Sequence, residues 1–240
     1  MAKLKYLVIH CTDTPEHMNV TPEMIKSWHT DKKPIGRGWS RVGYSDLIML
    51  DGTIKNLRPY DEDDKVEDFE VTNGARGYNG VSRHIAYSGG RDANSQKPKN
   101  TLNEAQLESL AEYVKEFIQN HPDAKVIGHN QINDYKKCPS FSVAFVFVIT
   151  LGFPKDSFML SDSEEEMYQK DKAPKKEAPE GLNPAIGQGV VTRDETSPDQ
   201  NPIGPKTEEQ WFKNGPKDSY GKFHMPFKSG KGQIESSDEE

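Results

Sequence analysis

Two short apolar runs, about 120 residues apart, each end on a histidine. The first runs from Tyr6 to Ile9 before His10, and the second from Val126 to Gly128 before His129. Both contain β-branched residues and predict strands. Side chains at the carboxyl ends of strands tend to project into the crevice beyond an open α/β sheet, where ligands are usually bound. We therefore expect a fold that brings the two histidines to one site.

Cys138, nine positions after the second histidine, adds a third potential ligand. Three protein ligands and a water are the catalytic zinc arrangement, whereas structural zinc is normally closed by four protein ligands. A lone cysteine is, however, more often a small buried hydrophobic residue. His84, inside another predicted strand, competes for a ligand role, although a histidine in that position is more often half-buried and hydrogen-bonded. Spacing alone therefore leaves zinc binding as one hypothesis beside a metal-free alternative.

The patterns between the two histidines predict the order β-α-β-β-β-α-β. Thr21 followed by Pro22 is a helix start, Asp51-Gly52 is a hairpin turn, and apolar residues recur at helical spacing up to Asn120. The expected elements are strand 3–10, helix 22–29, strands 44–50, 53–57 and 81–87, helix 101–120 and strand 125–128. This order predicts an α/β fold with a mixed central β-sheet flanked by helices.

Composition divides the chain into three parts. Only 33% of the residues are hydrophobic, below the usual 45–50%, and the deficit lies mainly after Leu160. Residues 161–240 carry about half of the prolines and supply roughly −6 of the formal charge of −7. We expect a folded domain over 1–142, an apolar segment of undecided structure over 143–160, and an acidic, Pro/Gly-rich, largely disordered tail over 161–240.

Several other classes of protein are disfavoured. Two cysteines do not make a disulfide framework, and no signal peptide precedes the first strand, so we expect synthesis in the cytoplasm. The longest apolar run, 141–153, falls short of the ~20 residues that span a bilayer. The charge pattern gives no basic footprint for nucleic acid. Among the remaining histidines, we interpret His29 as a cation at a helix end and His121 as a surface residue.

Several motifs in a fixed order resemble those of one known family. The motifs are Tyr6-Leu7-Val8-Ile9-His10-Cys11-Thr12, Gly38-Trp39-Ser40-Arg41-Val42-Gly43-Tyr44, Asp51-Gly52-Thr53, Gly77-Tyr78-Asn79, Gly128-His129 and Lys136-Lys137-Cys138-Pro139-Ser140-Phe141. Over about residues 3–142 the chain resembles the zinc-dependent N-acetylmuramoyl-L-alanine amidases of the bacteriophage-lysozyme type, which are relatives of the peptidoglycan recognition proteins.

The resemblance implies a site and a reaction. It implies that His10, His129 and Cys138 bind zinc and that Tyr44 and Lys136 are catalytic. The substrate would be peptidoglycan, cut by zinc-activated water at the amide between N-acetylmuramic acid and L-alanine of the stem peptide. An endolysin of a phage or prophage without a signal peptide would reach the cell wall after holin release, lysis or virion delivery.

The sequence departs from the family pattern at four places. Ser45 stands where the family often has histidine, and Gly74 where some relatives have one. Lys137 beside Lys136 leaves the lysine assignment open by one residue. The run from Val143 to Ile149 replaces a polar amphipathic helix. It could be a final buried strand or helix, or an abnormal terminus. Alternatively, residues 143–153 or the tail could be an interface for a protein partner.

Two other functions compete with zinc hydrolysis. A non-catalytic peptidoglycan-binding module would share the fold but lack the metal cysteine. The presence of Cys138 and Lys136 in this chain disfavours that function. A cysteine hydrolase would use Cys138 or Cys11 with a histidine. The pair of Cys11 with His10 is disfavoured, because neighbouring side chains in a strand point to opposite faces.

Overall fold

A five-stranded mixed sheet forms the centre of the computed structural model, which describes residues 1–172. Its order is β5 (Ile54–Asn56), β4 (Asp46–Ile48), β7 (Ser82–Tyr87), β2 (Tyr6–Cys11) and β9 (Lys125–Gly128). β4, β7, β2 and β9 are parallel, and β5 returns antiparallel to β4 through the Asp51-Gly52 turn. The predicted fold class and order of elements are confirmed.

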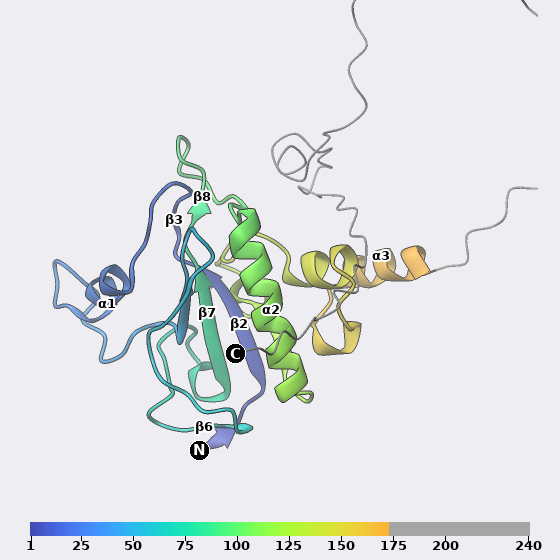
Figure 1. Cartoon of the computed structure of the whole chain (residues 1–240), viewed down its shortest axis with the longest axis horizontal. Coiled ribbons are helices and arrows are strands. Elements are labelled where there is room, and N and C mark those ends of the chain that lie inside the picture. Colours follow the sequence, from blue (N-terminus) through green and yellow to red (C-terminus); the bar gives the residue numbers. More distant parts are fainter. Residues whose placement is uncertain (173–240) are drawn as a thin grey trace, which may run out of the picture. The chain divides into compact units, whose positions relative to one another are not determined.

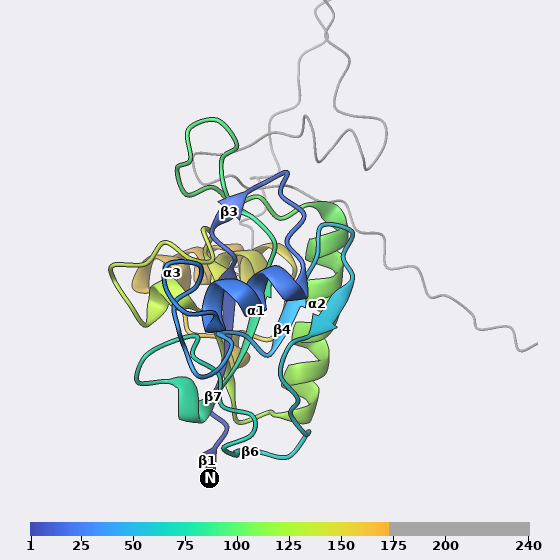
Figure 2. The same cartoon turned by 90° about the vertical axis from the view of Figure 1, so that its left-hand side faces the viewer.

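Two helices cover opposite faces of this sheet (Figures 1 and 2). α1 (Pro22–Thr30) begins at Thr21, whose side chain accepts a hydrogen bond from the Met24 backbone N–H. α2 (Glu104–Asn120) begins at Asn103, which forms a reciprocal capping box with Gln106. Each cap satisfies backbone donors that a helix start leaves unpaired. None of the helices within residues 1–172 is both long and apolar enough to cross a membrane.

Alternation along β2 decides which side chains reach the functional site. Leu7, Ile9 and Cys11 belong to the hydrophobic cluster that α2 covers. Successive side chains of a strand point to opposite faces, so His10 faces the side that α1 covers. The core beneath α2 also includes Val114, which is completely buried; burying such a side chain contributes about 1.5–3 kcal/mol.

Two short ladders that the sequence did not predict extend the sheet's ends. β1 (Ala2–Lys3) pairs with β6 (Lys65–Val66), and β3 (Thr14–Pro15) pairs with β8 (Gly90–Arg91). β3 and β8 follow β2 and β7 directly, so they continue the parallel pairing past the carboxyl ends of those strands. Short 3-10 turns occur at η1 (Asn79–Val81), η2 (His129–Gln131) and η4 (Lys155–Ser157).

The apolar segment after residue 142 is helical and buried. It includes the π-helix η3 (Phe145–Thr150), and it packs on the α2 side of the sheet. Phe147 is completely buried, with its ring 5.2 Å from that of Phe153 and 5.7 Å from that of Phe158. Of the alternatives left open by the sequence, the buried helix is therefore the one observed. The apolar side chains of this segment complete the protein's own core.

The predicted disorder is wrong for residues 162–172, which form α3 (Asp162–Lys172). Ser161 and Glu164 cap it reciprocally: the Ser161 N–H donates to the Glu164 carboxylate at 2.8 Å, and the Glu164 N–H donates to Ser161 Oγ at 3.4 Å. Lys155 adds an ion pair to Glu165 at 2.6 Å. Ser161 and Glu164 are a capping-box motif, which the prediction from the acidic composition of the segment did not take into account. The remainder of the predicted tail, 173–240, lies outside the described residues.

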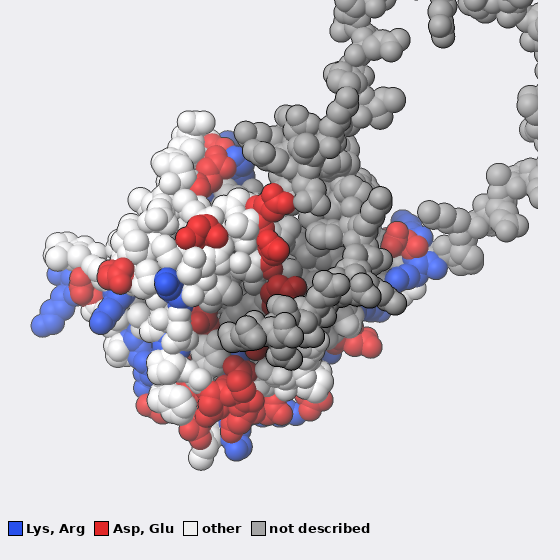
Figure 3. All heavy atoms as spheres, in the orientation of Figure 1, with Lys and Arg blue, Asp and Glu red and all other residues white. Residues whose placement is uncertain are grey.

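The acidic loop 59–70 is bound to the sheet by buried cationic and imidazole groups. Figure 3 shows Asp and Glu side chains gathered at the end of the molecule where β6 lies. Arg83 reaches Glu62 at 3.3 Å and stacks on the Tyr60 ring at 3.7 Å. His121 contacts Asp64 at 2.8 Å and Glu62 at 3.2 Å. The interpretation of His121 as a surface residue is wrong, because its side chain is buried against this loop.

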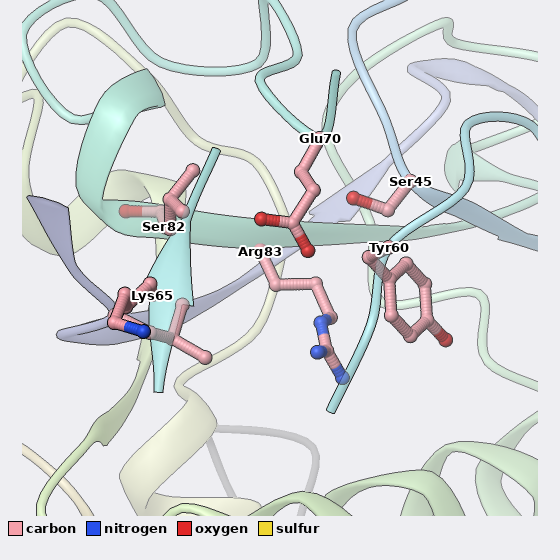
Figure 4. A pocket seen from close by; sticks show the side chains of 8 residues that line it. Ser45, Tyr60, Lys65, Glu70, Ser82 and Arg83 are labelled. Atoms are coloured by element: carbon pink, nitrogen blue, oxygen red, sulfur yellow. The ribbon is translucent and has the colours of Figure 1, made fainter. Parts of the chain in front are cut away.

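A small polar cavity lies under the same loop. Figure 4 shows Glu70, Ser82 and Arg83 around it. Its volume is about 10 Å³, close to the minimum for one water molecule, and Ser82 Oγ is a buried atom without a hydrogen-bond partner. This cavity suits one water molecule and is too small for a substrate.

Candidate metal and catalytic site

Three potential ligands converge at the carboxyl ends of β2 and β9. His10 lies near the end of β2, His129 follows β9 directly, and Cys138 comes from the loop after η2. Their ligand atoms all lie within 4.8 Å of one another. Because β2 and β9 are neighbours and parallel, their ends meet at the same edge of the sheet. The structure therefore brings together the three residues that the sequence singled out.

The distance between His10 and Cys138 matches that of two ligands on a tetrahedral zinc ion. His10 Nδ1 lies 3.6 Å from Cys138 Sγ. Zn–N and Zn–S bonds of about 2.05 and 2.3 Å at a tetrahedral angle separate nitrogen and sulfur by about 3.6 Å. The Cys11 backbone N–H also donates to Cys138 Sγ at 3.2 Å, an interaction that favours sulfur as thiolate.

The electrostatics keep both imidazoles neutral. Burial, followed by the neighbouring His84 and His129, holds the pKa of His10 well below 6.5. Burial and the Lys136 ammonium lower the pKa of His129 to about 4. Burial raises the pKa of the Cys138 thiol, so metal binding at neutral pH must release its proton. Two neutral imidazoles with free lone pairs and one ionisable sulfur form a donor set suited to zinc.

Tyr44 lies beside this cluster. Its ring centroid is 5.2 Å from that of His10. Burial, followed by Cys138 and Cys11, raises the pKa of the Tyr44 phenol well above 10. The phenol is therefore protonated at neutral pH, and it can donate a hydrogen bond to an oxygen that gains negative charge.

Lys136 lies in the loop that leads to Cys138. Its positive charge lowers the pKa of both His10 and His129, which places its field at two of the candidate ligands. Lys137 lines the same groove, and of the two lysines Lys136 is the one among the main causes of these shifts.

The site opens into a groove of about 810 Å³, within the usual range for ligand sites. Trp28, Trp39 and Tyr135 give it apolar surface, and Arg37 and Arg76 give it positive charge. It can therefore accept an extended ligand that combines flat apolar faces with carboxylates.

Two further histidines lie beside the site, and the sequence had identified only His84 of these as a candidate ligand. His29 is buried, accepts a hydrogen bond from the Gly43 N–H at 3.0 Å, and stacks on Trp39. Burial and Arg37 lower the pKa of His29 to about 4, so its interpretation as a helix-end cation is wrong. Its position four residues after Ile25, on the apolar face of α1, was the available signal.

His84 is the second of these. The sequence predicted a hydrogen-bonded strand histidine, and its Nδ1 does lie 3.0 Å from His10 Nε2. Burial, followed by the charge of His129, lowers the pKa of His84 to about 3. The partner of His84, however, is His10, a predicted metal ligand. The local sequence pattern around His84 could not show this partner.

Comparisons with known proteins show which family and which proteins this chain is similar to. Residues 1–141 match the family described as N-acetylmuramoyl-L-alanine amidase. The endolysin of Enterobacteria phage K11 is 30% identical over 135 residues, covering 56% of this chain and 80% of that protein. The endolysin of Escherichia phage T7 is 28% identical over 137 residues, covering 57% and 81%. Among solved structures, the Ph2119 endolysin from Thermus scotoductus MAT2119 bacteriophage Ph2119 is 25% identical, with a TM-score of 0.45, covering 58% of this chain and 79% of that one.

Proposed function

Because the chain belongs to the N-acetylmuramoyl-L-alanine amidase family, which matches residues 1–141, we propose that it is a zinc-dependent amidase. It is a peptidoglycan hydrolase of the phage endolysin type, and the bond cut would be the amide between N-acetylmuramic acid and L-alanine of the stem peptide. The observation that carries the zinc proposal is the convergence of His10, His129 and Cys138 within 4.8 Å.

The reaction is an amide hydrolysis in which a water oxygen adds to the carbonyl carbon and the C–N bond breaks. A zinc ion held by the three ligands would polarise the carbonyl and lower the pKa of water. The protonated phenol of Tyr44 would donate a hydrogen bond to the carbonyl oxygen as it becomes negative. The Lys136 ammonium would stabilise the same charge, and the alanine nitrogen leaves with a proton as a free amine.

The groove supports a muramyl-peptide substrate. Its aromatic side chains, Trp39 and Tyr135, offer flat faces to sugar rings or alkyl chains. Arg37 and Arg76 offer guanidinium groups to the carboxylates of a stem peptide. The enzyme would act on the cell wall after holin release, lysis or virion delivery.

The proposal is tested by zinc content and by the release of new L-alanine amino termini from purified peptidoglycan. We expect one bound zinc, activity that a chelator abolishes and zinc restores, and neither zinc nor activity in Cys138→Ala. Activity that survives both chelation and Cys138→Ala would refute the metal mechanism. A protein that binds peptidoglycan but releases no amino termini would instead be the non-catalytic module.

The catalytic roles are tested in variants that keep the metal ligands. Tyr44→Phe should retain zinc and lose about 10²–10³-fold in kcat, the usual loss when one donor to an oxyanion is removed. Lys136→Ala should also retain zinc and lose turnover, and Lys137→Ala is its matched control. If Lys137→Ala is the slower enzyme, the two lysines have been assigned in the wrong order.

A further inference from the structure

A second imidazole holds the non-ligating nitrogen of His10. His10 Nε2 lies 3.0 Å from His84 Nδ1, while His10 Nδ1 lies 3.6 Å from Cys138 Sγ. The histidine side chains are 1% and 0% exposed. The His10 ring therefore has one nitrogen at the metal cluster and the other against the next strand.

The proton between the two rings can take only one arrangement if His10 binds metal through Nδ1. A neutral imidazole carries one proton, so a free lone pair on Nδ1 requires the proton on Nε2. His10 Nε2–H must then donate to His84 Nδ1, and His84 must carry its own proton on Nε2. The reverse hydrogen bond would put a proton on His10 Nδ1 and block ligation.

We propose that His84 is a positioning residue that accepts the Nε2–H of His10, thereby fixing both the orientation and the metal-binding tautomer of this ligand. The inference rests on the proposed zinc site. Partners of this kind orient metal-bound histidines in general, most often as a carboxylate or a backbone carbonyl. Here a neutral imidazole would fill that role, without adding a negative charge beside the site.

Gly74 provides the space that this arrangement needs. A Cβ at position 74 would lie 2.4 Å from His84 Nδ1 and 2.5 Å from the Gly43 carbonyl oxygen. Any side chain there would therefore meet the atom that bonds His10. This chain therefore combines Gly74 with a histidine on β7.

The other nitrogen of His84 makes no hydrogen bond within residues 1–172. His84 Nε2 is a buried atom without a hydrogen-bond partner. Uncompensated buried polar atoms are rare in native structures and call for a reason. An apolar side chain would avoid the cost of burying an unpaired nitrogen, so a histidine at this position fits a function for its Nδ1.

The test compares His84→Asn, whose side-chain oxygen can take the place of Nδ1, with His84→Leu, which has similar size and no acceptor. Zinc affinity is measured by competition with a chromogenic chelator, and stability by thermal unfolding of the metal-free proteins. We expect His84→Leu to bind zinc about 10–100-fold more weakly and His84→Asn to remain close to wild type. His121→Leu is the control, since it removes a buried histidine that contacts Glu62 and Asp64 instead of the ligands.

Equal zinc affinity in His84→Leu, His84→Asn and wild type would overturn the inference and leave the proposed function intact. Failure of the wild-type chain to bind zinc would overturn both. If His84→Leu does not fold, nitrogen NMR of the zinc-loaded wild type decides the question. A protonated, slowly exchanging Nε2 on His10 supports the inference, and a proton on its Nδ1 refutes it.

Discussion

Replacing His29 should make the protein less sensitive to acid. Burial and Arg37 lower the pKa of His29 from 6.5 to about 4 in the folded chain, whereas an unfolded chain exposes it to water at a pKa near 6.5. Between these values the unfolded state binds one more proton than the folded state. The free energy of unfolding therefore falls as the pH falls from about 6.5 to about 4. His29→Asn removes this dependence, and its side-chain oxygen can still accept the Gly43 N–H.

The size of the effect follows from the two pKa values. With pKa values of 6.5 and about 4, His29 alone should cost about 2 kcal/mol of stability between pH 8 and pH 5, and about 3 kcal/mol below pH 4. The side chain is 7% exposed, so solvent screening reduces the effect little. His10, His84 and His129 also have lowered pKa values, and they add the same slope to wild type and variant alike.

The assay is urea unfolding of the metal-free protein from pH 8 to pH 5. Chelator is present throughout, because proton competition for the zinc ligands would otherwise add its own pH dependence. Wild type should lose about 2 kcal/mol more than His29→Asn across this interval. The exposed His17 is the control, and His17→Asn should follow wild type. Parallel curves for wild type and His29→Asn would show that His29 is protonated equally in both states, and the argument from burial would be refuted.

Two further predictions test the packing. Phe147→Ala should lower the free energy of unfolding by about 3–5 kcal/mol, because Phe147 is completely buried. The control Phe69→Ala removes an exposed side chain and should change the free energy of unfolding by less than about 0.5 kcal/mol. Similar unfolding curves for the two variants would contradict the burial of residues 143–153 and favour a partner surface there. Gly74→Ala should lower the free energy of unfolding in urea by about 1–3 kcal/mol through overpacking. The control Gly80→Ala adds a Cβ to open space and should lower it little. Equal losses of stability in the two variants would mean that the neighbours of position 74 move away from the added Cβ at no cost.

Local patterns in the sequence predicted the main strands and helices and singled out His10, His129 and Cys138. The strand ends at His10 and His129 depend on apolar runs, and the start of α1 depends on Thr21 followed by Pro22; each is a short-range signal. That β2 and β9 are neighbouring parallel strands is known only from the structure. The resemblance supplied Tyr44 and Lys136, which spacing alone could not identify.

The tertiary structure decided the features that depend on distant neighbours. His84 and His29 have ordinary local contexts, and only the packing of β7 beside β2, and of α1 over Gly43, shows their partners. The segment after residue 142 has no polar face in its sequence, so burial under α2 and α3 could not be told from exposure to a partner. Hydrophobic periodicity reports which face of an element is buried, but a hydrogen bond between two buried imidazoles depends on the register of strands 74 residues apart.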